Sequence, residues 1–197
     1  MIDADAVAAN VALARQRIAA AAGGRQVRLV AVTKGFGPDA VSAAAAAGCD
    51  AIGENYAQEL LAKRAAVDAA GLPVHFIGQL QTNKVRQLTG IVTVWETVDR
   101  DRLVDELARR APGGRVLVQV DAAGEAAAGK GGCRPDEVPA LVARARAAGL
   151  AVEGLMTVGP TSGAEAAARA AFRAVVELAD SLALPARSMG MTADLDI

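Results

Sequence analysis

The chain has 197 residues, which is enough for one domain with a sizeable core. Its 21 Lys and Arg residues nearly balance 22 Asp and Glu residues, so the basic footprint of a nucleic-acid-binding protein is excluded. No window reaches the roughly 18 uninterrupted apolar residues of a membrane span, and Asp3 and Asp5 are wrong for a secretory signal. Cys49 and Cys133 form no CxxC pair, which indicates reduced thiols in a cytoplasmic protein.

The predicted elements alternate between helices and short apolar strands along the whole chain. A helix over about residues 3–22 ends at Gly23-Gly24. The β-branched run at 27–32 follows and is typical of a parallel strand covered on both faces. Further strands are predicted at 50–52, 74–77, 91–94 with its continuation, 116–120, 152–156 and 187–191. Helices are predicted near 38–47, 54–70, 82–89, 99–110, 135–148 and 163–183.

Turn and cap residues support these boundaries. Pro38 suits the first turn of a helix. Three glycines fall just past predicted helix ends, where a left-handed residue is favoured: Gly48, Gly71 and Gly149. Three polar residues are predicted to be N-caps: Thr82, Asp99 and Thr161.

Strand–helix alternation predicts a parallel α/β fold, either an open doubly wound sheet or a (β/α)8 barrel. The first strand ends in Thr33-Lys34-Gly35-Phe36-Gly37-Pro38, which is not a GxGxxG loop, and polar residues follow many strands, as in TIM-type barrels. We therefore expect a single barrel domain over 1–197. Seven strands are predicted, and 194–197 reads as the first turn of a seventh crossover helix, so we expect the eighth strand to be missing and the domain to be C-terminally incomplete.

Lys34 stands at the carboxyl end of the first strand. A lysine there is costly to bury unless its amine reaches a cavity or a partner. A desolvated lysine has a lowered pKa, and its neutral amine can attack an aldehyde such as that of pyridoxal 5'-phosphate (PLP). The alternative is a lysine that extends from the barrel mouth into solvent.

Two more polar stretches follow the second and third strands. Asn55, in Gly53-Glu54-Asn55-Tyr56, offers donor and acceptor groups at the same rim as Lys34, although the stretch is equally typical of a strand–helix turn. The sequence holds one histidine, His75, inside the third strand, where a lone histidine is more often a core residue than a base. Gly78 lies at the carboxyl end of that strand.

A phosphate site is predicted after the seventh strand. Ser188, Met189, Gly190 and Thr192 combine small hydroxyls with a glycine just before a helix start, where backbone N–H groups can hold phosphate. Against this, Asp194 and Asp196 would repel an anion if they pointed the same way, and Thr192 could simply be a helix cap. Glu125 and Lys130 indicate a rim loop with no assigned chemistry.

These stretches together resemble the YggS/PROSC family of pyridoxal phosphate homeostasis proteins. The matching segments are Ala31–Lys34, Gly53–Tyr56, His75–Lys84, Gly154–Met156 and Ser188–Thr192, in the family's order and spacing. The resemblance implies a barrel like that of alanine racemase, in which Lys34 forms the Schiff base, Asn55 lines the cofactor pocket and Ser188 with its neighbouring backbone holds the phosphate. It also implies an eighth strand and an RxGTAxFG-like segment, neither of which occurs in this sequence.

We therefore predict a cofactor site made of Lys34, Asn55, His75, Gly78, Ser188, Met189, Gly190 and Thr192, with PLP as the cofactor and no metal. The resemblance implies a cytoplasmic PLP carrier or regulator in PLP homeostasis, without robust turnover. PLP-dependent apoenzymes are its expected partners, and the chain is expected to be a monomer or weak dimer. The alternatives are a racemase-type PLP enzyme, which needs a second acid/base group, and a barrel that binds a phosphorylated metabolite without Schiff-base chemistry.

Overall fold

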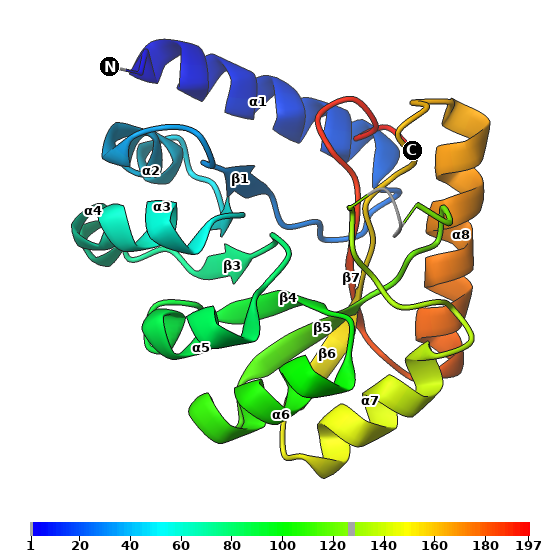
Figure 1. Ribbon diagram of the computed structural model, residues 1–197. Coiled ribbons are helices and arrows are strands. Elements are labelled where there is room, and N and C mark those ends of the chain that lie inside the picture. Colours follow the sequence, from blue (N-terminus) through cyan, green and yellow to red (C-terminus); the bar gives the residue numbers. More distant parts are fainter. Residues whose placement is uncertain (1, 126–128) are drawn as a thin grey trace.

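The computed structural model describes residues 2–125 and 129–197 and shows one curled parallel sheet with helices on its outer face (Figure 1). All neighbouring strands are parallel and follow one another in chain order across the sheet. The strands in the described residues are β1 (Val30–Val32), β2 (Ala51–Glu54), β3 (Val74–Phe76), β4 (Val94–Val98), β5 (Arg115–Gln119), β6 (Ala151–Met156) and β7 (Ala186–Ser188). The expected seven-stranded TIM-type arrangement is confirmed.

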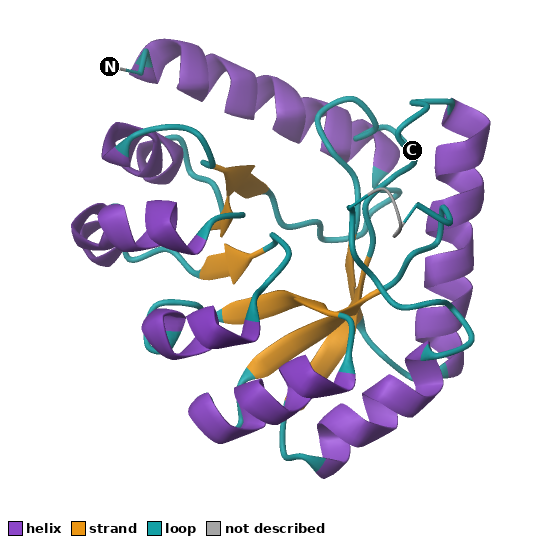
Figure 2. Cartoon of the chain, in the orientation of Figure 1, coloured by secondary structure: helices purple, strands orange, loops and turns teal. Residues whose placement is uncertain are grey.

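The first helix precedes β1, and the others connect successive strands and cover the convex face of the sheet (Figure 2). They are α1 (Ala4–Ala21), α2 (Pro38–Ala46), α3 (Ala57–Ala62), α4 (Arg64–Ala70), α5 (Thr82–Leu88), α6 (Asp101–Arg110), α7 (Val138–Ala147) and α8 (Glu165–Ser181). The single helix predicted over 54–70 is divided at Lys63, whose φ and ψ of −93° and 1° depart from the helical values. None of the helices in the described part of the chain is long and apolar enough to cross a membrane.

Alternate strand residues face two different apolar layers, as strand geometry requires. The larger layer lies between the strands and the helices and includes Ile52, Phe76 and Leu155. A smaller cluster of Val94, Leu117 and Met156 packs on the concave side. Small residues let the strands fit together there: a Cβ built on Gly154 would lie 1.9 Å from the Ala186 carbonyl oxygen.

The first strand, at one end of the sheet, is shorter and more exposed than the sequence predicted. β1 begins at Val30 rather than at residue 27, and both Val27 and Val32 are 45% exposed. The reason is topological, because β1 stands at one end of the strand order and pairs only with β2 among the described residues. Helix α1 crosses between the two ends: the N–H of Ile2, just before α1, donates to Asp39 in the first turn of α2, and Arg17 of α1 binds Asp196 beyond β7 (Figure 1).

Turn glycines follow the predictions more closely than the caps do. Gly48, Gly71 and Gly149 all have positive φ at helix ends, and Pro38 opens α2. The predicted N-caps Thr82, Asp99 and Thr161 are wrong, since the observed N-cap positions are Gln81, Arg100 and Ala164, none with a side-chain cap bond. Asp99 and Thr161 instead face other loops at the barrel rim.

Candidate cofactor site at the barrel rim

Lys34 lies in a tight turn just beyond β1. The Phe36 N–H closes the turn by donating to the Thr33 carbonyl oxygen at 3.2 Å, and Gly35 has a φ of +77°, which favours glycine. Lys34 is exposed, and its amine has no hydrogen-bond or ion-pair partner within the described residues. The amine is thus available to a ligand at the rim, and it is not desolvated by the protein itself.

A buried charge cluster lies directly behind this turn. Lys63 Nζ is 2.7 Å from Glu54 Oε1 and 2.7 Å from the Thr33 carbonyl oxygen, and the two charged side chains are 3% and 0% exposed. Glu54 Oε1 also accepts the Thr33 hydroxyl at 2.5 Å. The sequence analysis did not single out this pairing and named Glu54 only as part of the Gly53–Tyr56 stretch. The only local signal is the i,i+4 spacing of Glu59 and Lys63, which is typical of a surface ion pair on one helix and does not point to Glu54.

Asn55 follows β2 and has an unsatisfied buried acceptor. Its side-chain oxygen Oδ1 is buried without a hydrogen-bond partner in the described structure. Buried polar atoms are nearly always paired, so an orphaned amide oxygen on a rim is an indication of a missing ligand or water. Lys34 and Asn55 lie on neighbouring loops, because Val32 pairs with Gly53 in the β1–β2 register.

Gly78 has a packing role beside Asn55. A Cβ at position 78 would lie 2.0 Å from the Asn55 carbonyl oxygen, so no other residue fits without a backbone shift. The Gly78 carbonyl oxygen accepts the Thr97 hydroxyl at 2.7 Å. Gly78 therefore sets the position of the Asn55 backbone.

His75 and Ser188 are brought together by a residue that the sequence analysis did not single out, Glu96. The His75 Nδ1 atom is hydrogen-bonded to Glu96 Oε1, and Ser188 Oγ donates to Glu96 Oε2 at 2.6 Å. His75 and Glu96 are buried, which fits the expectation that a lone strand histidine is a satisfied core residue. The three side chains link β3, β4 and β7. Ser188 of β7 lies 92 positions after Glu96 in the sequence.

The turn after β7 holds its own carboxylates. Gly190 has a φ of +91°, Met189 packs against the main core, and Thr192 is exposed. Asp194 accepts the Met191 N–H, so one backbone donor of the predicted phosphate site is already used. The second carboxylate, Asp196, points to Arg17, whose hydrogen bonds hold the pKa of Asp196 below its ordinary value.

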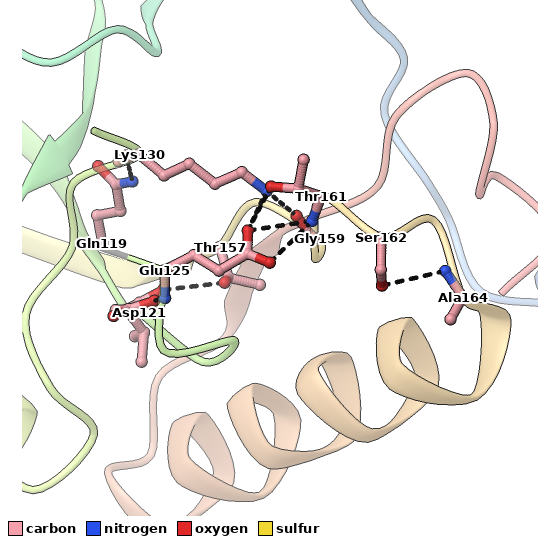
Figure 3. A network of polar contacts seen from close by, with 10 residues as sticks. Gln119, Asp121, Glu125, Lys130, Thr157, Gly159, Thr161, Ser162 and Ala164 are labelled. Atoms are coloured by element: carbon pink, nitrogen blue, oxygen red, sulfur yellow. Dashed lines mark hydrogen bonds and ion pairs between the residues drawn. The ribbon is translucent and has the colours of Figure 1, made fainter. Parts of the chain in front are cut away.

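The loops after β5 and β6 are tied together on the same rim (Figure 3). Glu125 accepts the Thr161 N–H and hydroxyl and pairs with Lys130 at 2.7 Å, while Lys130 Nζ donates to the Gly159 carbonyl oxygen at 2.6 Å. The hydrogen bond from Lys130, followed by those from Thr161, lowers the pKa of Glu125 to about 2. This rim loop is thus anchored across β5 and β6.

The described residues contain no group of three or more His, Cys, Asp or Glu side chains placed to hold a metal ion. What the described rim offers is a free amine, an orphaned amide oxygen and hydroxyl and backbone donors beyond β7. Such a set suits an organic ligand that carries an electrophile and an anionic group.

Comparison with known proteins gives the same architecture. Residues 2–195 match the sequence profile described as "Alanine racemase, N-terminal domain". Among curated proteins, the pyridoxal phosphate homeostasis protein of Pseudomonas aeruginosa is 39% identical over 202 residues, covering 96% of this chain and 87% of the relative. The protein of the same name from Aquifex aeolicus is 35% identical, covering 86% of this chain and 78% of the relative.

Solved structures agree with the sequence comparisons. A protein of unknown function from Bifidobacterium adolescentis has a TM-score of 0.91 and 31% identity, covering 100% of this chain and 91% of that one. PipY from Synechococcus elongatus, solved with PLP bound, has a TM-score of 0.79 and 28% identity, and the match covers 93% of this chain and 92% of that one. Alanine racemase from Clostridium difficile, at 13% identity and a TM-score of 0.71, shares the fold and covers 94% of this chain and 50% of that one. The chain therefore belongs to the alanine racemase N-terminal domain family and to the pyridoxal phosphate homeostasis proteins.

Proposed function

We propose that this chain binds PLP as a Schiff base on Lys34 and holds the cofactor without robust turnover. The observation that carries the proposal is the unpaired Lys34 amine at the rim, one loop away from the orphaned oxygen of Asn55. When bound, PLP supplies an aldehyde that condenses with a neutral lysine amine, with release of one water. The PLP-bound structure of the related PipY supports the choice of cofactor.

Ser188 at the end of β7 and the turn that follows it would hold the phosphate. Ser188 Oγ and the backbone N–H groups near Gly190 are the available donors, and both regions already serve carboxylates, Glu96 and Asp194. A phosphate must therefore compete with these carboxylates for its donors, or share them. Such competition favours a reversible carrier over a site of very tight retention.

A racemase needs an acid/base group on the ring face opposite the lysine. The sequence contains one tyrosine, Tyr56, which is 56% exposed and follows β2 on the same rim as Lys34. We therefore favour the carrier over the enzyme.

The proposal extends to the setting of the protein. A barrel domain spanning residues 1–197 would work in the cytoplasm as a monomer or weak dimer and pass PLP to PLP-dependent apoenzymes. The reduced, buried thiols of Cys49 and Cys133 are compatible with that compartment.

The test is a titration of the purified chain with PLP, followed by absorbance near the edge of the visible range and by borohydride reduction. The wild-type protein should develop the imine band and, after reduction, carry one phosphopyridoxyl group on the peptide containing Lys34. The Lys34→Ala variant should lose the band and the label while keeping affinity for pyridoxine 5'-phosphate, which has no aldehyde. An unchanged, borohydride-stable label in that variant, or no band in the wild type, would overturn the proposal.

A further inference from the structure

The turn that carries Lys34 is held on both sides by charged side chains from outside the turn. On one side, the Thr33 carbonyl oxygen accepts Lys63 Nζ at 2.7 Å. On the other, the Gly35 N–H donates to Glu59 Oε2 at 2.7 Å. The two peptide groups that flank Lys34 are therefore each fixed by a charge-assisted hydrogen bond, which is stronger than a neutral one.

Both bonds belong to one cluster. Lys63 Nζ is 2.7 Å from Glu54 Oε1 and 3.6 Å from Glu59 Oε2, so one ammonium faces two carboxylates. Glu54 and Lys63 are fully buried, whereas the Glu59 side chain is 35% exposed. Glu59 thus connects the rigid buried pair to the exposed turn, and it can be changed without leaving a charge deep in the core.

We propose that Glu59 is a positioning residue that holds the Lys34 turn in the shape needed for Schiff-base formation, with Lys63 and Glu54 as its buried support. This inference rests on the proposed function. Without the Glu59 acceptor, the Gly35 N–H bonds to water and the turn samples other shapes, while the phosphate donors beyond β7 are untouched. Reaction at the Lys34 amine then suffers more than binding of the rest of the cofactor.

The experiment compares two ligands in five forms of the chain. PLP reports on Schiff-base formation through its absorbance band, and pyridoxine 5'-phosphate reports on binding without that reaction. The forms are the wild type, Glu59→Ala, Glu59→Gln, Gly35→Ala and Asp68→Ala. Asp68 is the matched control, because it is also the acidic member of an i,i+4 ion pair, with Arg64, and lies on the neighbouring helix α4.

Glu59→Ala should raise the apparent dissociation constant of the PLP complex about tenfold, the equivalent of about 1.4 kcal/mol. The pyridoxine 5'-phosphate constant should stay within about twofold of wild type. Glu59→Gln keeps an oxygen acceptor for the Gly35 N–H and should restore most of the PLP affinity. Asp68→Ala should match the wild type with both ligands.

Gly35→Ala tests the same turn without touching the cluster. No atom lies within 4 Å of the added Cβ, so the variant should fold, but its φ of +77° is unfavourable for alanine and the turn should shift. It should weaken PLP binding and spare pyridoxine 5'-phosphate, as Glu59→Ala does. This variant keeps the question answerable if Glu59→Ala fails to fold.

The outcomes distinguish failure of the proposed PLP function from failure of the positioning role of Glu59. If the wild type gives no imine band, the proposed function fails, and the positioning role fails with it. If the wild type gives the band and Glu59→Ala binds PLP equally well, only the positioning role is overturned. Equal weakening of both ligands by Glu59→Ala would also overturn it, since that result indicates general damage to the fold. No rescue by Glu59→Gln would overturn it as well, because an oxygen acceptor for the Gly35 N–H would then not be what the turn needs.

Discussion

Replacing Lys63 by methionine is expected to be among the most destabilising single changes in this chain. Methionine is similar in length to lysine and is readily accommodated in apolar surroundings. The substitution removes the ammonium that lies 2.7 Å from Glu54 Oε1, and Glu54 is fully buried. Its other oxygen, Oε2, already lacks a partner in the described structure, so the carboxylate would keep only the Thr33 hydroxyl.

The size of the loss follows from this geometry. Removing one partner of a buried ion pair costs about 3–5 kcal/mol, because the remaining charge stays buried and uncompensated. For a domain of this size, 1 kcal/mol shifts the melting temperature by about 2–4 °C, so the expected drop is about 6–20 °C. By contrast, Asp68→Ala breaks an exposed pair with Arg64 and should cost no more than about 1 kcal/mol.

Urea denaturation measures the free energies of unfolding of the Lys63→Met and Asp68→Ala variants by linear extrapolation. A second change, Glu54→Gln, made together with Lys63→Met, removes the buried carboxylate charge that has lost its partner. The double variant should therefore recover part of the lost free energy of unfolding. The resulting double-mutant cycle isolates the pair from the other contacts of each residue. A loss below about 1 kcal/mol for Lys63→Met, at an unchanged denaturant slope, would refute the burial of this cluster.

Three further predictions concern the rim and the thiols. Lys130→Met should raise the pKa of Glu125 from about 2, because the Lys130 hydrogen bond is the largest cause of its lowering; carboxyl NMR titration measures the shift. Since the folded pKa lies below the ordinary 4.5, this carboxylate's contribution to stability is present above pH 4.5 and is lost as the pH falls toward 2. Burial raises the pKa of Cys133 to about 12, so iodoacetamide at pH 8 should label it only on unfolding, as mass spectrometry would show. Gly78→Ala should displace the Asn55 backbone, 2.0 Å from the new Cβ, and weaken both PLP and pyridoxine 5'-phosphate binding in the titration. Equal affinities in that variant and the wild type would contradict a role for Asn55 in the site.

Sequence reasoning worked where the signal was local. Glycines at 48, 71 and 149 marked helix ends because only a residue that tolerates positive φ suits those positions. The strand–helix alternation predicted parallel strands, and parallel strands present all their carboxyl ends on one rim. That rule alone brought Lys34 and Asn55 to neighbouring loops.

Sequence reasoning failed where partners are distant or where alternatives are locally equivalent. Any of several polar residues could have capped α5, α6 and α8, and the observed cap positions use none of those predicted. Glu96 carries no local mark of its role, yet it joins His75 to Ser188 across the concave side. The predicted six-residue first strand is shorter in the structure because pairing at a sheet edge, rather than β-branched composition, sets its length.

The order of residues along the chain determined the parallel barrel, its rim and the lysine that stands there, because periodicity, glycine placement and strand polarity are properties of neighbouring residues. Tertiary structure alone decided which charges are buried against one another. Lys63 binds Glu54, which is 9 positions away in the sequence, and the Thr33 carbonyl oxygen, which is 30 positions away. Ser188 binds Glu96, which is 92 positions away. Only folding brings such groups within hydrogen-bond distance and out of water, and it is this removal from water that makes their pairing decisive.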